Sequence, residues 1–178
     1  MNKISILVAD DHKIVRMGLK SLFAAARDLS VIGEADDGVA AVRQALRLRP
    51  DVVVMDLMMP EKDGVAATAE IRARLPDTRI VVLTSYSTSD TIAAALSAGA
   101  SGAVMKSADD ATLLTAVRAA AAGETFISPE VRGLLAVDPP APTLSPRQLE
   151  VLEMLVKLDA ANRTEAAAIA LRKHLVKV

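Results

Sequence analysis

Five polar residues whose chemistry fits phosphoryl transfer occur at the ends of short apolar runs. They are Asp10, Asp11, Asp56, Thr84 and Lys106. Clustered carboxylates repel one another, and Mg²⁺, which binds one or two carboxylates and keeps water or phosphate on its other positions, removes that repulsion. A lysine and a hydroxyl beside the ion supply a positive charge and a hydrogen-bond donor for a phosphoryl group. The set predicts phosphoryl transfer to a carboxylate, which forms an acyl phosphate.

Asp56 is the candidate acceptor, because it follows the apolar run 52–55 and lies between the acidic pair of the first run and the lysine of the last. Taken singly, an aspartate after a strand is usually a helix cap and a lysine is usually a solvated surface residue. The joint placement at four strand ends is what favours a site. His12 follows the acidic pair, but no second histidine lies nearby, so it is interpreted as a partly exposed residue without a chemical role.

The elements that would position these residues alternate between strands and helices. Five short β-branched runs predict strands, and segments with apolar residues at helical spacing lie between them. Continuously apolar strands in this alternation predict a parallel sheet covered by helices on both faces, with ligands bound beyond the carboxyl ends of the strands. The predicted strands are Ile4–Ala9, Val31–Ala35, Val52–Met55, Ile80–Leu83 and Ala103–Met105.

Composition limits the classes of protein to consider. A chain of 178 residues allows one main domain and a small appendage. The net charge of −1 does not indicate a nucleic acid or membrane partner, and the absence of cysteine excludes disulfides and thiolate metal sites. No apolar run approaches the roughly 18 residues that would span a bilayer, and the start of the chain becomes acidic where a signal peptide would stay apolar. We therefore expect a soluble cytoplasmic protein.

The pattern changes after residue 122. Gly123 stops the preceding helix, and the stretch 123–143, which is rich in proline and alanine towards its end, is interpreted as a linker with room for a short helix. Ser145 and Pro146 form a favourable helix start, and a second start follows at Asn162. The tail 144–178 is therefore predicted to contribute about two helices.

Four motifs, all within residues 1–122, resemble the receiver domain of two-component response regulators in their amino-acid sequence and in their order along the chain. They read ILVADDHKIVRMGL, VVVMDLMMPEKDG, VVLTSY and AGASGAVMK. The resemblance implies a flavodoxin-like α/β fold whose five parallel strands have the order 2-1-3-4-5, with helices on both faces. The first and fourth motifs and the tail are similar to the NarL/FixJ subfamily, whose members usually carry a LuxR-type helix-turn-helix. Residues 1–122 would be the receiver domain, 123–143 the linker, and 144–178 a LuxR-type helical remnant.

The resemblance also implies roles for individual residues. A partner histidine kinase would phosphorylate Asp56, and Thr84 and Lys106 would contact the phosphoryl group. The receiver would assist only its own phosphorylation and dephosphorylation and would not act as an enzyme on other substrates. The residues expected to bind Mg²⁺ are Asp11, Asp56 and the backbone carbonyl of Met58, with Asp10 assisting.

Two features depart from the family pattern. The family commonly has an aromatic residue where this chain has Ala103, so a ring rotation cannot report phosphorylation here, and we expect coupling that is weaker or follows another route. In the tail, LSPRQLEVLEML resembles the first LuxR-type helix and KLDAANRTEAAAIALRKHLV the last, but the stretch between them, with the recognition helix, is absent. Because that helix reads base edges, DNA binding is expected to be impaired or absent.

Three functional hypotheses remain open at this point. In the first, a phosphorylated receiver acts through a protein contact, a homodimer, or competition for kinase phosphoryl groups. In the second, a transcription factor still touches DNA through the residual tail, although six Lys/Arg against four Asp/Glu in 144–178 make a weak basic surface. In the third, the chain is a Mg²⁺-dependent phosphatase of the haloacid dehalogenase kind. The order of motifs argues against this third hypothesis, because those enzymes place the nucleophile after the first strand and the acidic pair late.

Overall fold

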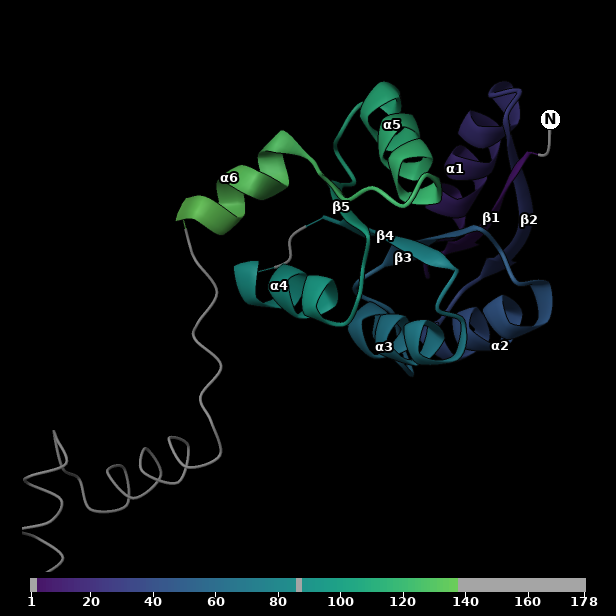
Figure 1. Cartoon of the computed structure of the whole chain (residues 1–178), viewed down its shortest axis with the longest axis horizontal. Helices are drawn as coiled ribbons and strands as arrows, with labels where there is room; N and C mark the ends of the chain where they lie inside the picture. Colours follow the sequence, from purple (N-terminus) through teal and green to yellow (C-terminus); the bar gives the residue numbers. More distant parts are fainter. Residues whose placement is uncertain (1–2, 86–87, 138–178) are drawn as a thin grey trace, which may run out of the picture. The chain divides into compact units, whose positions relative to one another are not determined.

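The structure, a computed structural model, describes residues 3–85 and 88–137 (Figure 1). In these residues a six-stranded sheet has the order β2-β1-β3-β4-β5-β6, and every pair of neighbouring strands is parallel. The strands are β1 Ile4–Ala9, β2 Leu29–Ala35, β3 Val52–Asp56, β4 Arg79–Thr84, β5 Gly102–Met105 and β6 Phe126–Ile127. The helices are α1 Lys13–Ala25, α2 Gly38–Leu48, α3 Gly64–Arg74, α4 Ser89–Ser97, α5 Asp110–Ala121 and α6 Pro129–Val137.

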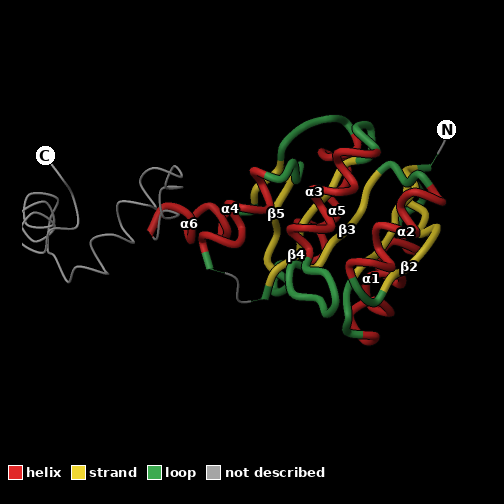
Figure 2. Tube along the Cα trace, turned by 90° about the horizontal axis from the view of Figure 1, so that it is seen from below, coloured by secondary structure: helices red, strands yellow, loops and turns green. Residues whose placement is uncertain are grey.

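The α/β fold with strand order 2-1-3-4-5 is confirmed. Helices cover both faces of the sheet: α1 and α5 lie on one side and α2, α3 and α4 on the other (Figure 1). Figure 2 shows the same arrangement turned by 90°. No helix in the described part of the chain is long and apolar enough to cross a membrane.

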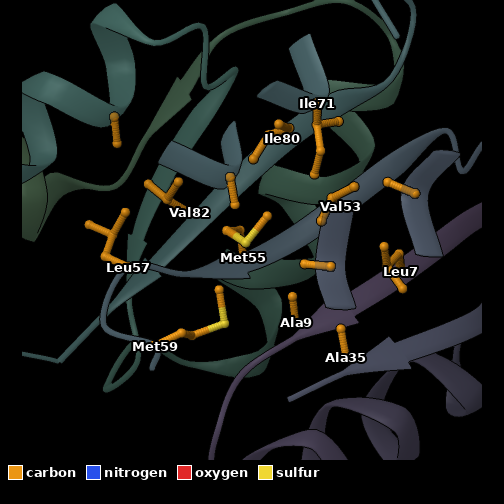
Figure 3. Packing of buried hydrophobic residues seen from close by; sticks show 14 of the residues in the cluster. Leu7, Ala9, Ala35, Val53, Met55, Leu57, Met59, Ile71, Ile80 and Val82 are labelled. Carbon is orange, nitrogen blue, oxygen red and sulfur yellow. The ribbon is translucent and has the colours of Figure 1, made fainter. Parts of the chain in front are cut away.

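The central strands are apolar at every position because both of their faces are buried. Successive side chains point to opposite faces, so Ile6 packs in the layer under α1 and α5, and Leu7 packs in the layer under α2, α3 and α4. Figure 3 shows the second layer, in which Val53 and Met55 of β3 and Ile71 of α3 lie close together. Burial of these aliphatic side chains contributes roughly 1.5–3 kcal/mol each to folding.

Five of the described helices begin with a side-chain cap. The capping residues are Asp37, Asp63, Thr88, Asp109 and Ser128, and each accepts a hydrogen bond from the backbone N–H three residues later. Such caps satisfy an otherwise unpaired N–H and stabilise a helix by about 1 kcal/mol. His12 occupies the same position before α1, but its side chain makes no capping hydrogen bond. The start of α1 therefore differs from the start of the five capped helices.

The short strand β6 and the helix α6 extend the sheet beyond β5. Gly102 and Ala103 of β5 pair with Phe126 and Ile127, and α6 packs against β5 and α4. Val131 of α6 is fully buried in the layer that also contains Ala103. β6 was not predicted from the sequence, because a two-residue strand is too short to show a periodic pattern.

Candidate functional site

The register of the sheet brings the ends of four strands together. In neighbouring strands Ala9 is level with Met55, Asp56 with Leu83, and Thr84 with Met105. The next residues along the chain therefore meet at one edge, where Asp10 and Asp11 follow β1 and Lys106 follows β5. This is the edge at which the sequence predicts the site.

The acidic residues of this edge form a compact cluster. One ligand atom from each of Asp10, Asp11, His12 and Asp56 lies within 4.8 Å of the others. Asp10 and Asp56 are buried, whereas the side chain of Asp11 is 32% exposed. The predicted convergence of the three aspartates is therefore observed. His12 joins them, although the sequence analysis gave it no role.

Lys106 joins the two buried aspartates. Its Nζ lies 2.6 Å from Oδ2 of Asp10 and 2.7 Å from Oδ2 of Asp56, and its backbone N–H donates to the carbonyl of Thr84 at 2.8 Å. Thr84 is buried at the end of β4. Lys106 therefore pairs with two of the three carboxylates, and Asp11 lies beside His12 instead.

Met58 lies in the loop after β3 and is exposed. Its backbone N–H donates to Oδ1 of Asp56 at 3.3 Å, so the two Asp56 oxygens have different partners: Met58 holds Oδ1 and Lys106 holds Oδ2. This arrangement fixes the orientation of the Asp56 carboxylate.

The charged groups of the site oppose one another. Burial raises the pKa of the Asp56 carboxyl, and the nearby charge of Asp10 adds to this effect, which outweighs the hydrogen bond and charge of Lys106 that lower it. Burial alone would lower the pKa of Lys106, but its hydrogen bonds and ion pairs with Asp10 and Asp56 prevail and raise it. Lys106 therefore stays protonated, and the Asp56 carboxyl is harder to ionise than an ordinary aspartate.

The donor atoms of the cluster suit a hard divalent cation. Mg²⁺ prefers carboxylate and carbonyl oxygens and retains several waters, so a small, partly open set of aspartates fits it. Two of the three carboxylates are buried. Burying ionised carboxylates is costly without a counter-charge, and a bound cation offsets this cost.

Two residues that the sequence analysis missed shape the site. Arg16 donates from Nη1 to the backbone carbonyls of Asp10 (2.7 Å) and Asp11 (3.3 Å), which fixes the loop between β1 and α1. Gly64 opens α3, and a Cβ atom there would lie 2.1 Å from the carbonyl oxygen of Asp56. The Asp63-Gly64 pair is a common turn sequence and could have indicated the role of Gly64. No sequence pattern indicates contacts between the Arg16 side chain and backbone carbonyls.

Comparisons with known proteins agree with this geometry. The model of the response regulator receiver domain matches residues 6–118, which is more than half of the chain. The transcriptional regulatory protein LiaR of Bacillus subtilis is 36% identical over 209 residues, covering 97% of this chain and 99% of LiaR. The response regulator VraR of Staphylococcus aureus is 37% identical over 128 residues, covering 72% of this chain and 61% of VraR.

A solved structure is also similar. The crystal structure of a LuxR-family two-component response regulator from Aurantimonas sp. SI85-9A1 shares 38% identity and a TM-score of 0.72, over 76% of this chain and 97% of the other. Proteins of this group are signalling receivers and not classical enzymes. The chain belongs to the response regulator receiver family, with relatives among the LuxR-type regulators of two-component systems.

Proposed function

We propose that this chain accepts a phosphoryl group on Asp56 from a histidine kinase, in a reaction that requires Mg²⁺. The observation that carries the proposal is the position of Lys106, whose Nζ contacts buried Asp10 and Asp56 at 2.6 and 2.7 Å beside a third aspartate. An ordinary structural ion pair would match one carboxylate with one cation. The excess of carboxylates here suits a site that a divalent ion and a phosphate complete.

The chain's own residues supply most of the chemistry. An Asp56 oxygen forms a new bond to phosphorus while the bond from phosphorus to the kinase imidazole nitrogen breaks, which yields an acyl phosphate. Lys106 stays protonated and balances charge on the transferred oxygens, and the Thr84 hydroxyl donates a hydrogen bond to one of them. Asp10, Asp11, Asp56 and the Met58 carbonyl would hold Mg²⁺, which neutralises phosphate charge when bound.

Intact-mass spectrometry after incubation with acetyl phosphate and Mg²⁺ tests the phosphoacceptor. The wild-type chain should gain one phosphate, and Asp56→Asn should gain none. The matched control is Asp51→Asn, which removes a carboxylate at the opposite end of the same strand and should be phosphorylated like the wild type. An unmodified wild-type chain, or a phosphorylated Asp56→Asn variant, would disprove the assignment.

We further propose that DNA binding is impaired because the LuxR-type segment is internally shortened. That segment, 144–178, lies outside the described residues. The support comes from the alignment with LiaR, which runs over 209 residues whereas this chain has 178, so at least 31 aligned positions have no counterpart here. The output would then be a protein contact, a homodimer or competition for kinase phosphoryl groups in the cytoplasm.

The alternative is a transcriptional regulator that still contacts DNA through residues 144–178, and the LuxR-type relatives favour it. Gel-shift titrations of the phosphorylated chain separate the two hypotheses. We expect no preference for any duplex over random sequence and weak binding that salt abolishes. A sequence preference that survives moderate salt would support the regulator instead.

A further inference from the structure

The backbone of His12 is held in place on both sides. Its N–H donates to Oδ1 of Asp10 at 2.8 Å, and its carbonyl accepts from the N–H of Arg16 at 3.1 Å in the first turn of α1. The imidazole does not cap the helix. Instead, Nδ1 lies 2.6 Å from Oδ1 of Asp11 and 3.4 Å from Oδ1 of Asp10. The ring is therefore directed towards the carboxylates, although 68% of the side chain is exposed.

These separations bracket the spacing of adjacent ligand atoms around a single ion, and the shorter one is also the length of a hydrogen bond between the imidazole and the Asp11 carboxylate. Ligands at about 2.1 Å from an octahedral ion lie about 3.0 Å apart when adjacent and about 4.2 Å apart when opposite. The two distances from the imidazole nitrogen, 2.6 and 3.4 Å, fall on either side of the adjacent spacing. All four donor groups, including Asp56, lie within 4.8 Å of one another. Small side-chain movements would therefore let one ion contact the nitrogen together with the carboxylates.

An imidazole nitrogen changes which ions a site prefers. Mg²⁺ selects oxygen ligands, whereas imidazole suits transition metals such as Ni²⁺, Cu²⁺ and Zn²⁺, whose affinities follow a fixed order across sites. We propose that His12 Nδ1 is a further ligand of the metal site formed by Asp10, Asp11 and Asp56, and that it raises the affinity for nitrogen-binding divalent ions relative to Mg²⁺. This inference rests on the proposed phosphoacceptor site.

A second interpretation of the same distances is that the ring only donates a hydrogen bond to Asp11. In that case a side chain with an N–H donor but no ring nitrogen could replace it. The variant His12→Gln offers such a donor and lacks the imidazole. It therefore separates a metal ligand from a residue that merely orients Asp11.

The test is direct binding of Co²⁺ and Mg²⁺ to the full-length chain, measured by calorimetry, with the visible absorption of bound Co²⁺ as a spectroscopic check. The quantity of interest is the ratio of Co²⁺ affinity to Mg²⁺ affinity. We expect His12→Ala and His12→Gln each to lower this ratio about tenfold, and to alter the Co²⁺ spectrum as a nitrogen ligand is lost.

Two controls match the variants. Ile14→Ala removes an exposed side chain two residues along the chain, and His174→Ala removes the second of the two histidines. Neither should change the ratio. If His12→Ala or His12→Gln keeps the wild-type ratio, His12 is not a ligand. If Asp56→Asn binds Mg²⁺ as tightly as the wild type, the failure lies in the proposed phosphoacceptor site and not in the role of His12.

Discussion

Two aspartates at opposite ends of β3 show how one residue type serves different purposes. Asp51 precedes the strand, is exposed, and accepts hydrogen bonds from the backbone N–H (2.7 Å) and Oγ (2.6 Å) of Ser5. Asp56 ends the strand, is buried, and faces Asp10 as well as Lys106. The carboxylate at the amino end is satisfied by its own chain. The carboxylates at the other end outnumber the lysine that contacts them, which is typical of a functional site.

Replacement of Lys106 should have the largest effect on stability. Lys106→Met leaves Asp10 and Asp56 buried without their cation, and breaking a buried pair in this way costs about 3–5 kcal/mol. Urea unfolding in EDTA measures the loss. Added Mg²⁺ should restore part of it, because the ion replaces some of the missing positive charge. An unfolding midpoint equal to that of the wild type would show that burial of Asp10 and Asp56 does not depend on the charge of Lys106.

Crowding at Gly64 should have the next largest effect. Gly64→Ala places a methyl group where backbone atoms of Asp56 and Leu57 already lie, so α3 must shift, at a cost of about 1–3 kcal/mol. Gly18→Ala is the matched control, because no heavy atom lies within 4 Å of a Cβ there and alanine favours a helix. Thermal unfolding should show a loss for the first variant and a small gain for the second. Equal midpoints would contradict the close packing of α3 on β3.

Removal of the Asp56 charge should stabilise the metal-free protein. The folded state raises the pKa of Asp56 and therefore favours the protonated carboxyl. This preference stabilises the folded protein at low pH. The stabilisation is lost as pH rises from the pKa of the unfolded state through the raised pKa of the folded state. Asp56→Asn should therefore unfold at higher urea than the wild type at pH 7 in EDTA. The difference should shrink as pH falls towards the ordinary aspartate pKa.

Magnesium provides the control for this stability prediction. Mg²⁺ should raise the unfolding midpoint of the wild type more than that of Asp56→Asn, because the ion binds the folded carboxylate cluster. An Asp56→Asn variant that is less stable than the wild type at pH 7 without metal would mean that the Lys106 ion pair outweighs burial, contrary to the raised pKa.

The smallest effect is expected at Asp51. Asp51→Ala removes the hydrogen bonds with Ser5 that join the starts of β1 and β3, and such exposed contacts contribute about 0.5–1.5 kcal/mol. Urea unfolding should show this loss at pH 7 with or without Mg²⁺, because the site lies at the other end of the sheet. A response to Mg²⁺ that differs from the wild type would show that the two ends of β3 are coupled.

Most of the site could be predicted because its chemistry follows from residue type and strand position. Asp10, Asp56 and Lys106 stand at the ends of apolar runs, and parallel strands bring such ends together. The contacts of Arg16 could not be predicted, since backbone carbonyls have no residue signature. The position of the His12 ring could not be predicted either, because it is defined by contacts with Asp10 and Asp11 that residue type alone does not indicate.

The fold was predictable to a similar extent. Continuous apolar runs predicted the first five strands with bounds at most two residues off. The largest difference is at β2, which begins at Leu29, and β6 was not predicted. Both differences occur where pairing with a neighbour determines the strand: Leu29 pairs with Ile4, and Phe126 pairs with Gly102. Tertiary pairing of this kind overrides local propensity.

The contrast in exposure across the site has a consequence for the lifetime of the signal. Asp56 is 3% exposed, whereas its neighbours Met58 and His12 are well exposed. If Asp56 carries the proposed acyl phosphate, water that hydrolyses it would have to pass the exposed side chains of Met58 and His12. Substitutions at these two positions would then change the lifetime of the acyl phosphate and leave the buried groups of the site unchanged.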